Sequence, residues 1–555
     1  MPSVSAHVAR TLAAHVDHVF GVMGNGNAYF LDELDRTAAT FTAVRHEAGG
    51  VVAADAYHRA SGRIAAATAT YGAGFTNTLT ALAEAAQARI PLVLVVGDEP
   101  TSGPRPWGVD QIALGSAVGV RTYTVGERDA AATTAIALEH ALTYRRPAIL
   151  AIPYDVAARE AGEVPPPTPL TLAAHEGPAV PFTAAALDRV TDALTGAERP
   201  FLLAGRGAWL ADAGAALGAL AEATGAVTAS TALGRGIFPD QRYDLGVTGG
   251  FGAEGAMRLV READVAVVFG AGLNQFTMRF GELFDPRTRV FQIDTAAAAT
   301  HPQVGGFVRA DAADAAAAIL SRLRARGAHP SGWRESVDVA ALRVRDTGDG
   351  VAADGRLDPR TVAVRIGELL PEDRVVVSDG GHFLGWSNMY WPVTSPDRVM
   401  MVGTAYQSIG LGFPSVPGAA AARPESTIVL TTGDGGGLMA IADLESAVRV
   451  AGGRGLAVVW NDAAYGAEVN LYGLKGLARE PMLIPEVDFA AVARGFGAEG
   501  VVVRDMADLD ALARWTERDA HERPFLLLDL RISGDVIAPY QQEIIRVNSS
   551  PTVRP

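Results

Sequence analysis

Short apolar runs recur along the chain, separated by longer stretches in which apolar and small residues return at helical spacing. We expect strands at residues 17–20, 41–45, 64–70, 91–97, 200–205, 226–230, 265–270, 289–294, 374–378, 399–405, 427–430, 456–460 and 524–530. Helices are expected between them, one ending at Gly62 and one over residues 438–450. Strands that alternate with helices are typical of parallel sheets covered on both faces. The pattern therefore predicts the α/β class.

The predicted strands fall into three groups, which divide the chain into three domains. We expect doubly wound parallel-sheet domains at residues 1–160, 182–330 and 356–555. Residues 161–181 contain Pro165, Pro166, Pro167 and Pro169, and such a composition favours a stiff, extended linker. Residues 331–355 are polar and weakly patterned, so a second linker is expected there.

Composition narrows the classes of partner. The chain of 555 residues carries a net charge of −15 and no cluster rich in Lys or Arg, so nucleic acid and anionic membranes are poor partners. No apolar run approaches the ~20 residues that cross a bilayer, and the first residues lack the apolar core of a signal peptide. With no Cys, disulfides and thiolate chemistry are excluded. We expect a cytoplasmic protein.

Two acidic residues follow two predicted strands of the third group. Asp434 lies in Gly433-Asp434-Gly435-Gly436 after the strand at 427–430, and Asp462 follows the strand at 456–460. Parallel strand ends share one edge of a sheet, so both carboxylates are expected to converge on one hard cation. The glycines would let the backbone approach a phosphate. A glycine-rich turn without a ligand is the alternative.

This stretch resembles the thiamine diphosphate motif of the acetolactate synthase, pyruvate decarboxylase and benzaldehyde lyase superfamily. The resemblance implies thiamine diphosphate and Mg²⁺ as cofactors, with Asp434, Asp462 and the Ala464 carbonyl as metal ligands. Asp462 stands where many relatives have a second Asn. The cofactor contacts that the resemblance implies in this domain are Gln407, Ser408, Ile409, Gly433, Asp434, Gly435, Gly436 and Tyr465. In the family, the residue at Ile409 props the cofactor into a V shape.

The first 150 residues resemble the pyrimidine-binding domain of the same superfamily. The segment around Arg45-His46-Glu47 and the turn from Tyr71 to Asn77 match it in order. The resemblance implies that Glu47 is catalytic: its carboxylate favours the cofactor tautomer whose amino group takes the C2 proton. Gly72 and Asn77 are implied cofactor contacts. For an isolated Glu, an exposed or helix-capping acid is the alternative.

The second domain resembles the Rossmann-like central domain of the superfamily, which in some members holds FAD or a nucleotide. Gly205-Arg206-Gly207 and Gly270-Ala271-Gly272 follow two of its predicted strands. Neither completes the GxGxxG pattern, so structural loops are favoured over a nucleotide site. FAD is left open but not favoured.

The resemblance implies a thiamine diphosphate- and Mg²⁺-dependent enzyme, similar to acetolactate synthase. It would decarboxylate a 2-oxoacid, most simply pyruvate, and transfer the acyl-anion equivalent to a carbonyl acceptor. Alternatives are a nonoxidative 2-oxoacid decarboxylase and a benzaldehyde lyase-type hydroxyacyl lyase. A flavin-dependent pyruvate oxidase-like enzyme and a catalytically silent homologue are alternatives of other classes.

Substrate preference is not marked by a known pattern. Residues 105–111 reproduce neither the His pair of decarboxylating relatives nor the Phe-Gln of acetolactate synthases. Residues that could shape an uncommon pocket are Asn25, Tyr71, Trp107, Gln111 and His382. In the superfamily the pyrimidine domain of one subunit faces the diphosphate domain of another, which implies an obligate homodimer and favours a homotetramer. The family's C-terminal segment, here residues 537–555, covers the active-site mouth.

Overall fold

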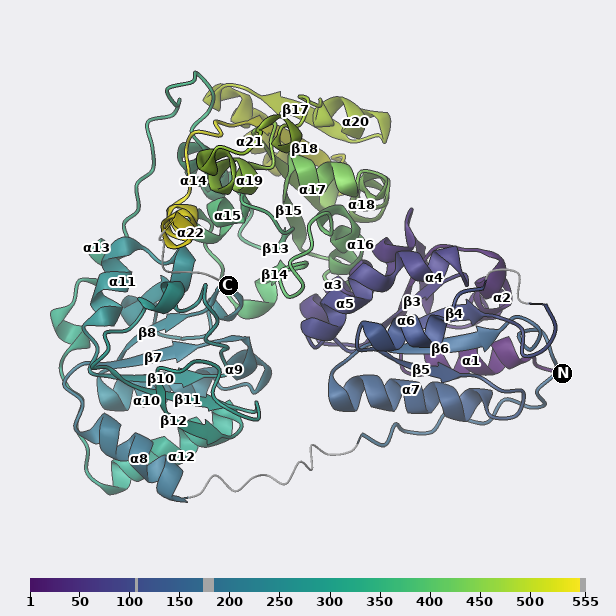
Figure 1. Cartoon of the computed structure of the whole chain (residues 1–555), viewed down its shortest axis with the longest axis horizontal. Helices are drawn as coiled ribbons and strands as arrows, with labels where there is room; N and C mark the ends of the chain where they lie inside the picture. The colour runs from purple at the N-terminus through teal and green to yellow at the C-terminus, as the bar shows by residue number, and fades with distance from the viewer. Residues whose placement is uncertain (105–107, 173–183, 550–555) are drawn as a thin grey trace.

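Three parallel sheets, each flanked by helices on both faces, make up the chain (Figure 1). The computed structural model describes residues 1–104, 108–172 and 184–549. The expected α/β class with three doubly wound units is therefore confirmed. No helix in these described ranges has the length and apolar character needed to cross a membrane.

The first sheet has the strand order β2-β1-β3-β4-β6-β5. Its strands are β1 His18–Gly21, β2 Thr40–Ala43, β3 Ala65–Ala69, β4 Leu92–Asp98, β5 Arg121–Thr124 and β6 Ala148–Pro153. The helices around it are α1 Val4–Ala13, α2 Ala28–Leu34, α3 Glu47–Ser61, α4 Ala73–Asn77, α5 Leu79–Gln87, α6 Gln111–Ala117 and α7 Ala130–Tyr144. The central strands β3 and β4 are buried on both faces, which explains their continuous apolar sequence.

The third sheet repeats the topology of the first, with the order β14-β13-β15-β16-β18-β17. Its strands are β13 Arg374–Ser378, β14 Val399–Met401, β15 Thr427–Gly433, β16 Gly455–Asn461, β17 Glu499–Val503 and β18 Leu526–Arg531. Its helices are α14 Pro359–Leu369, α15 Leu384–Tyr390, α16 Gly412–Ala422, α17 Asp434–Met439, α18 Asp443–Ala451, α19 Gly466–Leu471, α20 Phe489–Gly495, α21 Asp510–Glu517 and α22 Pro539–Ser549. After β13 the chain forms the edge strand β14 on one side and then β15 on the other side of β13, so a crevice is expected between the ends of β13 and β15.

The second sheet has the order β12-β11-β10-β7-β8-β9, the arrangement of a Rossmann fold. Its strands are β7 Pro200–Ala204, β8 Val227–Ser230, β9 Asp244–Val247, β10 Val265–Phe269, β11 Arg289–Asp294 and β12 Val304–Arg309. Its helices are α8 Ala184–Thr195, α9 Arg206–Leu210, α10 Gly214–Thr224, α11 Glu254–Arg261, α12 Ala312–Ala325 and the short α13 Val339–Leu342.

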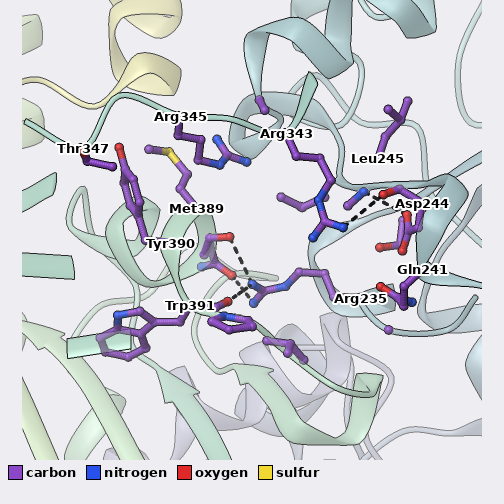
Figure 2. A pocket seen from close by; sticks show the side chains of 18 residues that line it. Arg235, Gln241, Asp244, Leu245, Arg343, Arg345, Thr347, Met389, Tyr390 and Trp391 are labelled. Atoms are coloured by element: carbon purple, nitrogen blue, oxygen red, sulfur yellow. Dashed lines mark hydrogen bonds between the residues drawn. The ribbon is translucent and has the colours of Figure 1, made fainter. Parts of the chain in front are cut away.

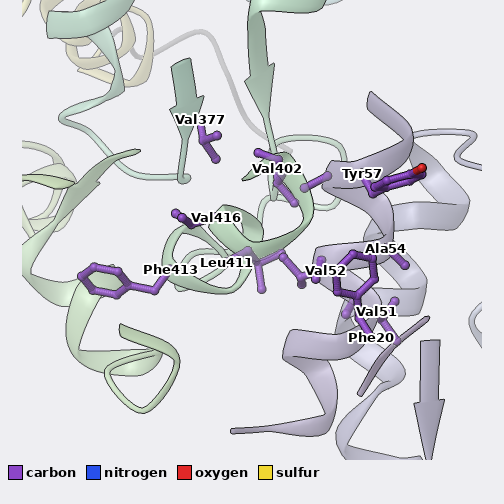
Figure 3. Close-up of a cluster of buried hydrophobic side chains, with 14 of the residues drawn as sticks. Phe20, Val51, Val52, Ala54, Tyr57, Val377, Val402, Leu411, Phe413 and Val416 are labelled. Carbon is purple, nitrogen blue, oxygen red and sulfur yellow. The ribbon is translucent and has the colours of Figure 1, made fainter. Parts of the chain in front are cut away.

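The first and third domains share one hydrophobic core. Helix α3 packs along α16, and the core between them joins Val52 and Tyr57 of the first domain to Leu411 and Val416 of the third (Figure 3). The packing is close: a Cβ atom added to Gly418 would lie 1.9 Å from the Ala53 carbonyl oxygen. The first and third domains of one chain therefore pack together as a single unit through α3 and α16.

The single helix expected over residues 438–450 is wrong, because the structure has two helices there. The backbone leaves helical geometry at Ala440 (φ −119°, ψ 24°), and α18 begins at Asp443. The strands that the pattern did not single out are β5, β6, β9, β12 and β17. Apart from β6, these lie at sheet edges. Partial exposure removes the continuous apolar run in β5, β12 and β17, whereas β9 is mostly buried but only four residues long.

Candidate active site

Two carboxylates lie at the carboxyl ends of the adjacent strands β15 and β16. Gly433 at the end of β15 pairs with Trp460, so Asp434 and Asp462 follow directly on neighbouring parallel strands. Both side chains are almost fully buried. Burial, together with the charge of Asp462, raises the pKa of Asp434 to about 7. The fold therefore holds two like charges close together in a buried place.

Each of these carboxylates has one oxygen already engaged and one without a partner. Oδ1 of Asp434 accepts the Gly435 N–H at 2.9 Å, and Oδ2 of Asp462 lies 2.9 Å from His382 Nε2. Asp434 Oδ2 and Asp462 Oδ1 are buried and have no hydrogen bond within the described residues. Buried unpaired carboxylate oxygens are costly, and a divalent cation would satisfy both.

A cation at this position would need oxygen ligands beyond acidic side chains. In the described part of the chain no group of three or more His, Asp or Glu residues could hold a metal. Ala464, whose carbonyl is the third expected ligand, is buried and pairs with Leu483 across an isolated bridge. Backbone and ligand oxygens are ordinary partners of Mg²⁺. The residues present thus fit a Mg²⁺ ion that shares its shell with a bound phosphate.

His382 connects this pair of strand ends to the C-terminal helix. Burial lowers its pKa, but the Asp462 carboxylate and the hydrogen bond to it outweigh that effect, so that the pKa is raised. Tyr540 of α22 donates its hydroxyl to the His382 carbonyl. Helix α22, which begins the segment expected to cover the site, therefore packs directly on the loop between β13 and α15.

The glycines after β15 are required by close contacts. A Cβ atom at Gly435 would lie 2.6 Å from Cε1 of Tyr465, and one at Gly436 would lie 2.8 Å from Oδ2 of Asp379. Real Cβ atoms do not approach so closely, so both positions exclude side chains. Close packing of Tyr465 and Asp379 accounts for both glycines, and contact of this turn with a phosphate stays a prediction.

Asp379, at the end of β13, fixes the loop that carries Gln407, Ser408 and Ile409. Its carboxylate accepts the N–H groups of Gly380, Gly410 and Leu411 and the Thr432 hydroxyl, at 2.8 to 3.2 Å. Burial raises the pKa of Asp379 to about 6, although these hydrogen bonds oppose the shift. Gln407 has φ 59°, a left-handed backbone that L-residues rarely adopt. The predicted cofactor loop is therefore held in one uncommon conformation.

A buried ion-pair network in the first domain holds the same loop from its other side. Glu84 accepts the Tyr406 N–H at 2.6 Å and the Ala405 N–H at 3.3 Å. Arg59 lies between Asp55 and Glu84, at 2.5 and 3.4 Å, and also donates to the Met401 carbonyl at 3.2 Å. The first domain therefore contacts the loop of Ile409 within the same chain.

Glu47 begins α3, where His46 is the N-cap residue. Asn77 donates to Glu47 Oε2 at 2.9 Å, and a Cβ atom at Gly74 would lie 3.3 Å from Oε1. Gly72 starts the turn with φ 62°, which favours glycine. The structure thus joins the predicted residues Glu47, Gly72 and Asn77, and leaves Glu47 half-buried.

Contacts near Glu47 connect it to the helix after the Asp434 turn. The Arg45 N–H donates to Asp443 Oδ1 at 2.8 Å, and the Arg45 guanidinium pairs with Glu445 at 2.7 Å. Asp443 is buried and begins α18. Completion of the site by a second subunit stays a prediction.

The residues predicted for the substrate pocket divide between two domains. Asn25 donates to the Tyr71 hydroxyl at 2.6 Å. Gln111 is buried; it accepts the Gly72 N–H at 2.8 Å and donates to the Gly97 carbonyl at 3.0 Å. His382 lies in the third domain beside Asp462. Trp107 falls outside the described residues.

The paired glycine turns of the second domain pack on each other. Gly207 donates its N–H to the Gly270 carbonyl at 2.8 Å, and a Cβ atom at Gly205 would lie 2.5 Å from the same oxygen. Close approach of two backbones explains these glycines without a nucleotide.

Sequence reasoning missed Asp379, Glu84 and Arg59 as residues that shape the site. Asp379 follows a predicted strand at the sheet edge where ligands bind, and that position was a usable signal. The roles of Glu84 and Arg59 depend on contacts over more than 300 positions of sequence, for which the pattern gives no signal.

Three sequence models of thiamine pyrophosphate enzymes match consecutive parts of the chain. The N-terminal TPP binding domain matches residues 2–114, the central domain residues 187–325 and the C-terminal TPP binding domain residues 379–528. The matched regions contain Glu47, Gly72 and Asn77 in the first part, and Asp434 and Asp462 in the third.

Curated proteins match over most of their length. A sulfoacetaldehyde acetyltransferase of Castellaniella defragrans is 27% identical, over 98% of this chain and 95% of its own. An acetolactate synthase large subunit of Parasynechococcus marenigrum is 29% identical, over 88% of this chain and 81% of its own. A solved structure, the thiamine diphosphate-dependent 4-hydroxybenzoylformate decarboxylase of Rhodococcus jostii RHA1, has a TM-score of 0.76 at 20% identity and covers 96% of this chain and 99% of that one. This last likeness supports the fold.

Proposed function

This chain belongs to the thiamine pyrophosphate enzymes, and we propose that it is a Mg²⁺-dependent acyltransferase that decarboxylates a 2-oxoacid. The simplest donor is pyruvate, and the acceptor is a second carbonyl compound. Relatives named sulfoacetaldehyde acetyltransferase match nearly the whole chain, which favours transfer over simple aldehyde release.

The observation that carries the proposal is the pair of unpartnered oxygens on Asp434 and Asp462. They would hold the Mg²⁺ ion together with the Ala464 carbonyl, and the glycine turn from Gly433 to Gly436 would lie against the diphosphate. Bound thiamine diphosphate supplies a carbon nucleophile and an electron sink for the loss of CO₂.

Glu47 acts on the other end of the cofactor. Its carboxylate would hold a proton at N1′ of the aminopyrimidine, and Asn77 orients that carboxylate through the bond to Oε2. Ile409, fixed between Asp379 and Glu84 by the contacts of its loop, would set the angle between the cofactor rings.

We infer that the active unit is an obligate homodimer that assembles further into a homotetramer, and that the protein is cytoplasmic. Large apolar side chains are exposed beside the site: Tyr406 adjoins Gln407, Met439 ends α17, and Leu483 lies opposite Ala464. A partner surface over these side chains would exclude water from the cofactor. Light scattering at micromolar concentration tests this, and a fully active monomer would exclude it.

Product analysis tests the reaction. The protein is incubated with thiamine diphosphate, Mg²⁺ and a panel of 2-oxoacids, with and without aldehyde or 2-oxoacid acceptors, while CO₂ and carbon products are followed together. CO₂ with a matching hydroxyketone or acetohydroxy acid is the expected result. CO₂ with free aldehyde would replace the transferase by a decarboxylase, and no CO₂ from any acid would contradict the proposal.

A further inference from the structure

A partly open cavity lies between the central and third domains, and its lining residues do not include the glycine turn of Asp434. It has a volume of about 410 Å³, within the range of about 300–1,000 Å³ that is usual for small-molecule sites. Its walls come from β9, the segment after α13, and the end of α15 (Figure 2). The segment after α13 belongs to the stretch that the sequence predicted as a featureless linker.

Positive charge dominates this cavity. Arg235, Arg343 and Arg345 line it, and of the lining residues in the described part of the chain Asp244 is the one acid. Burial raises the pKa of Asp244 to about 6. Tyr390 adds no negative charge at physiological pH, and burial raises its pKa further, to about 12. With Asp244 ionised beside the exposed Arg343, the positive charges of the more buried Arg235 and Arg345 stay uncompensated by any acid of the lining.

The three guanidinium groups find neutral acceptors within the described residues. Arg235 is 8% exposed and donates to the carbonyls of Ala232 and Asn388 and to the Asn388 side chain. Arg345 donates to the Phe251 carbonyl at 2.6 Å, and Arg343 makes a long bond of 3.4 Å to the Asp244 carbonyl. Peptide oxygens satisfy N–H groups but do not neutralise the charge.

The unfavourable burial of positive charge lowers the pKa of two of these arginines. Burial, with repulsion from Arg345, lowers the pKa of Arg235 to about 9. Burial, with the neighbouring Arg343 guanidinium, lowers the pKa of Arg345 to about 10. Buried charges without a counter-charge are normally removed or paired, because desolvation is not repaid. A bound anion would supply the missing partner.

We propose that this cavity binds a small oxyanion of at least two negative charges, a phosphate ester or a dicarboxylate, held by Arg343 and Arg345 above Arg235. Guanidinium groups bind such oxygens with paired, charge-assisted hydrogen bonds. Met389, Tyr390 and Trp391 add apolar surface for the rest of the ligand.

The site is built on the helix that leads from the cofactor site. Helix α15 spans seven residues from Leu384 to Tyr390, about 10 Å at the usual rise. Its first end follows His382, which contacts Asp462, while Arg235 caps its last end through Asn388. An anion at the arginines would therefore act on the end of the same helix.

Calorimetry on the holoenzyme tests the site without an activity measurement. Thiamine diphosphate and Mg²⁺ are kept saturating so that the diphosphate cradle is filled, and ionic strength is held constant with NaCl. The probes are inorganic phosphate, AMP and succinate. The variants are Arg343→Gln, which gives up one long hydrogen bond, and Arg345→Gln. The matched control is Arg287→Gln, an exposed arginine of the same domain that does not line the cavity.

We expect saturable binding of at least one probe, weakened tenfold or more in Arg343→Gln or Arg345→Gln and unchanged in Arg287→Gln. A preference for phosphate and AMP would identify a phosphate ester, and a preference for succinate a dicarboxylate. Absence of saturable heat with all three probes would overturn the site, as would equal affinity in the wild type and both cavity variants.

Discussion

The acids that face the proposed cofactor differ in how the fold holds them. Glu47 is half-buried and accepts one hydrogen bond from a neutral amide. Asp434 and Asp462 are buried, lie close to each other and keep two oxygens unpaired. A carboxylate that exchanges protons needs solvent access. Carboxylates that bind a cation can be buried close together, because the bound cation offsets their repulsion and desolvation.

The largest expected effect is on turnover, from Glu47→Gln. The amide keeps the size of the side chain and can still accept from Asn77, but it cannot hold and release the proton at N1′. We expect kcat to fall about 10²–10⁴-fold, the usual contribution of a positioned acid or base. Calorimetry should show that thiamine diphosphate affinity is kept.

Glu127→Gln is the matched control, because Glu127 is an exposed acid of the same domain that pairs with Arg159. It should leave both turnover and affinity unchanged. Near-normal turnover in Glu47→Gln would remove Glu47 from the proton path.

Arg59→Met tests the buried ion-pair network that holds the loop of Ile409. This change leaves Asp55 and Glu84 buried without their cation, and the loss of one partner from a buried pair costs about 3–5 kcal/mol. Urea unfolding should show that loss. Arg63→Met is the control: its surface pair with Asp17 is exposed, so a change within about 1 kcal/mol is expected. Equal stability of the two variants would contradict the role given to the network.

Asp434→Asn should separate metal binding from stability. Mg²⁺-dependent affinity for thiamine diphosphate is expected to fall at least about tenfold, because one anionic ligand is lost. The free protein should be no less stable at pH 8. The folded-state pKa of Asp434 is raised to about 7, so the stability that it contributes at low pH is lost as the pH rises through that value.

Thermal unfolding in EDTA and calorimetry with Mg²⁺ measure the two effects. Asp510→Asn, an exposed aspartate of the third domain, serves as the control. A destabilised free protein with unchanged cofactor affinity would make Asp434 a structural residue.

The smallest effect is expected for Tyr540→Phe. The hydroxyl of Tyr540 donates to the His382 carbonyl, and a neutral hydrogen bond contributes about 0.5–1.5 kcal/mol. We expect a loss of stability of this size and a reduction in kcat of a few fold. A loss of turnover as large as that of Glu47→Gln would place α22 in the chemistry itself.

The sequence predicted features whose cause is local. Two strands followed by Asp434 and Asp462 could be placed at one sheet edge, because parallel strands end together. The edge strands β9 and β12 gave no apolar run and were missed, because β9 has only four residues, two of them Asp244 and Gly246, and β12 is partly exposed. Position in the sheet, rather than local propensity, decides their structure.

The rest of the site depends on contacts between residues that are far apart in the sequence. Gln111 looked like a pocket residue, but its amide is used by the backbone at Gly72 and Gly97. Arg343 and Arg345 sat in a stretch without pattern and line a cavity only because β9 and α15 meet there. Contacts between elements of different domains are set by domain packing, which the pattern of a single sequence does not indicate.

The most direct test of the account is a calorimetric titration of thiamine diphosphate into the metal-free protein, with Mg²⁺ and then with EDTA. The unpaired oxygens of Asp434 and Asp462 predict saturable binding with Mg²⁺ that is lost in EDTA. Equally tight binding in EDTA would contradict the metal site, and no binding under either condition would contradict the cofactor assignment as a whole.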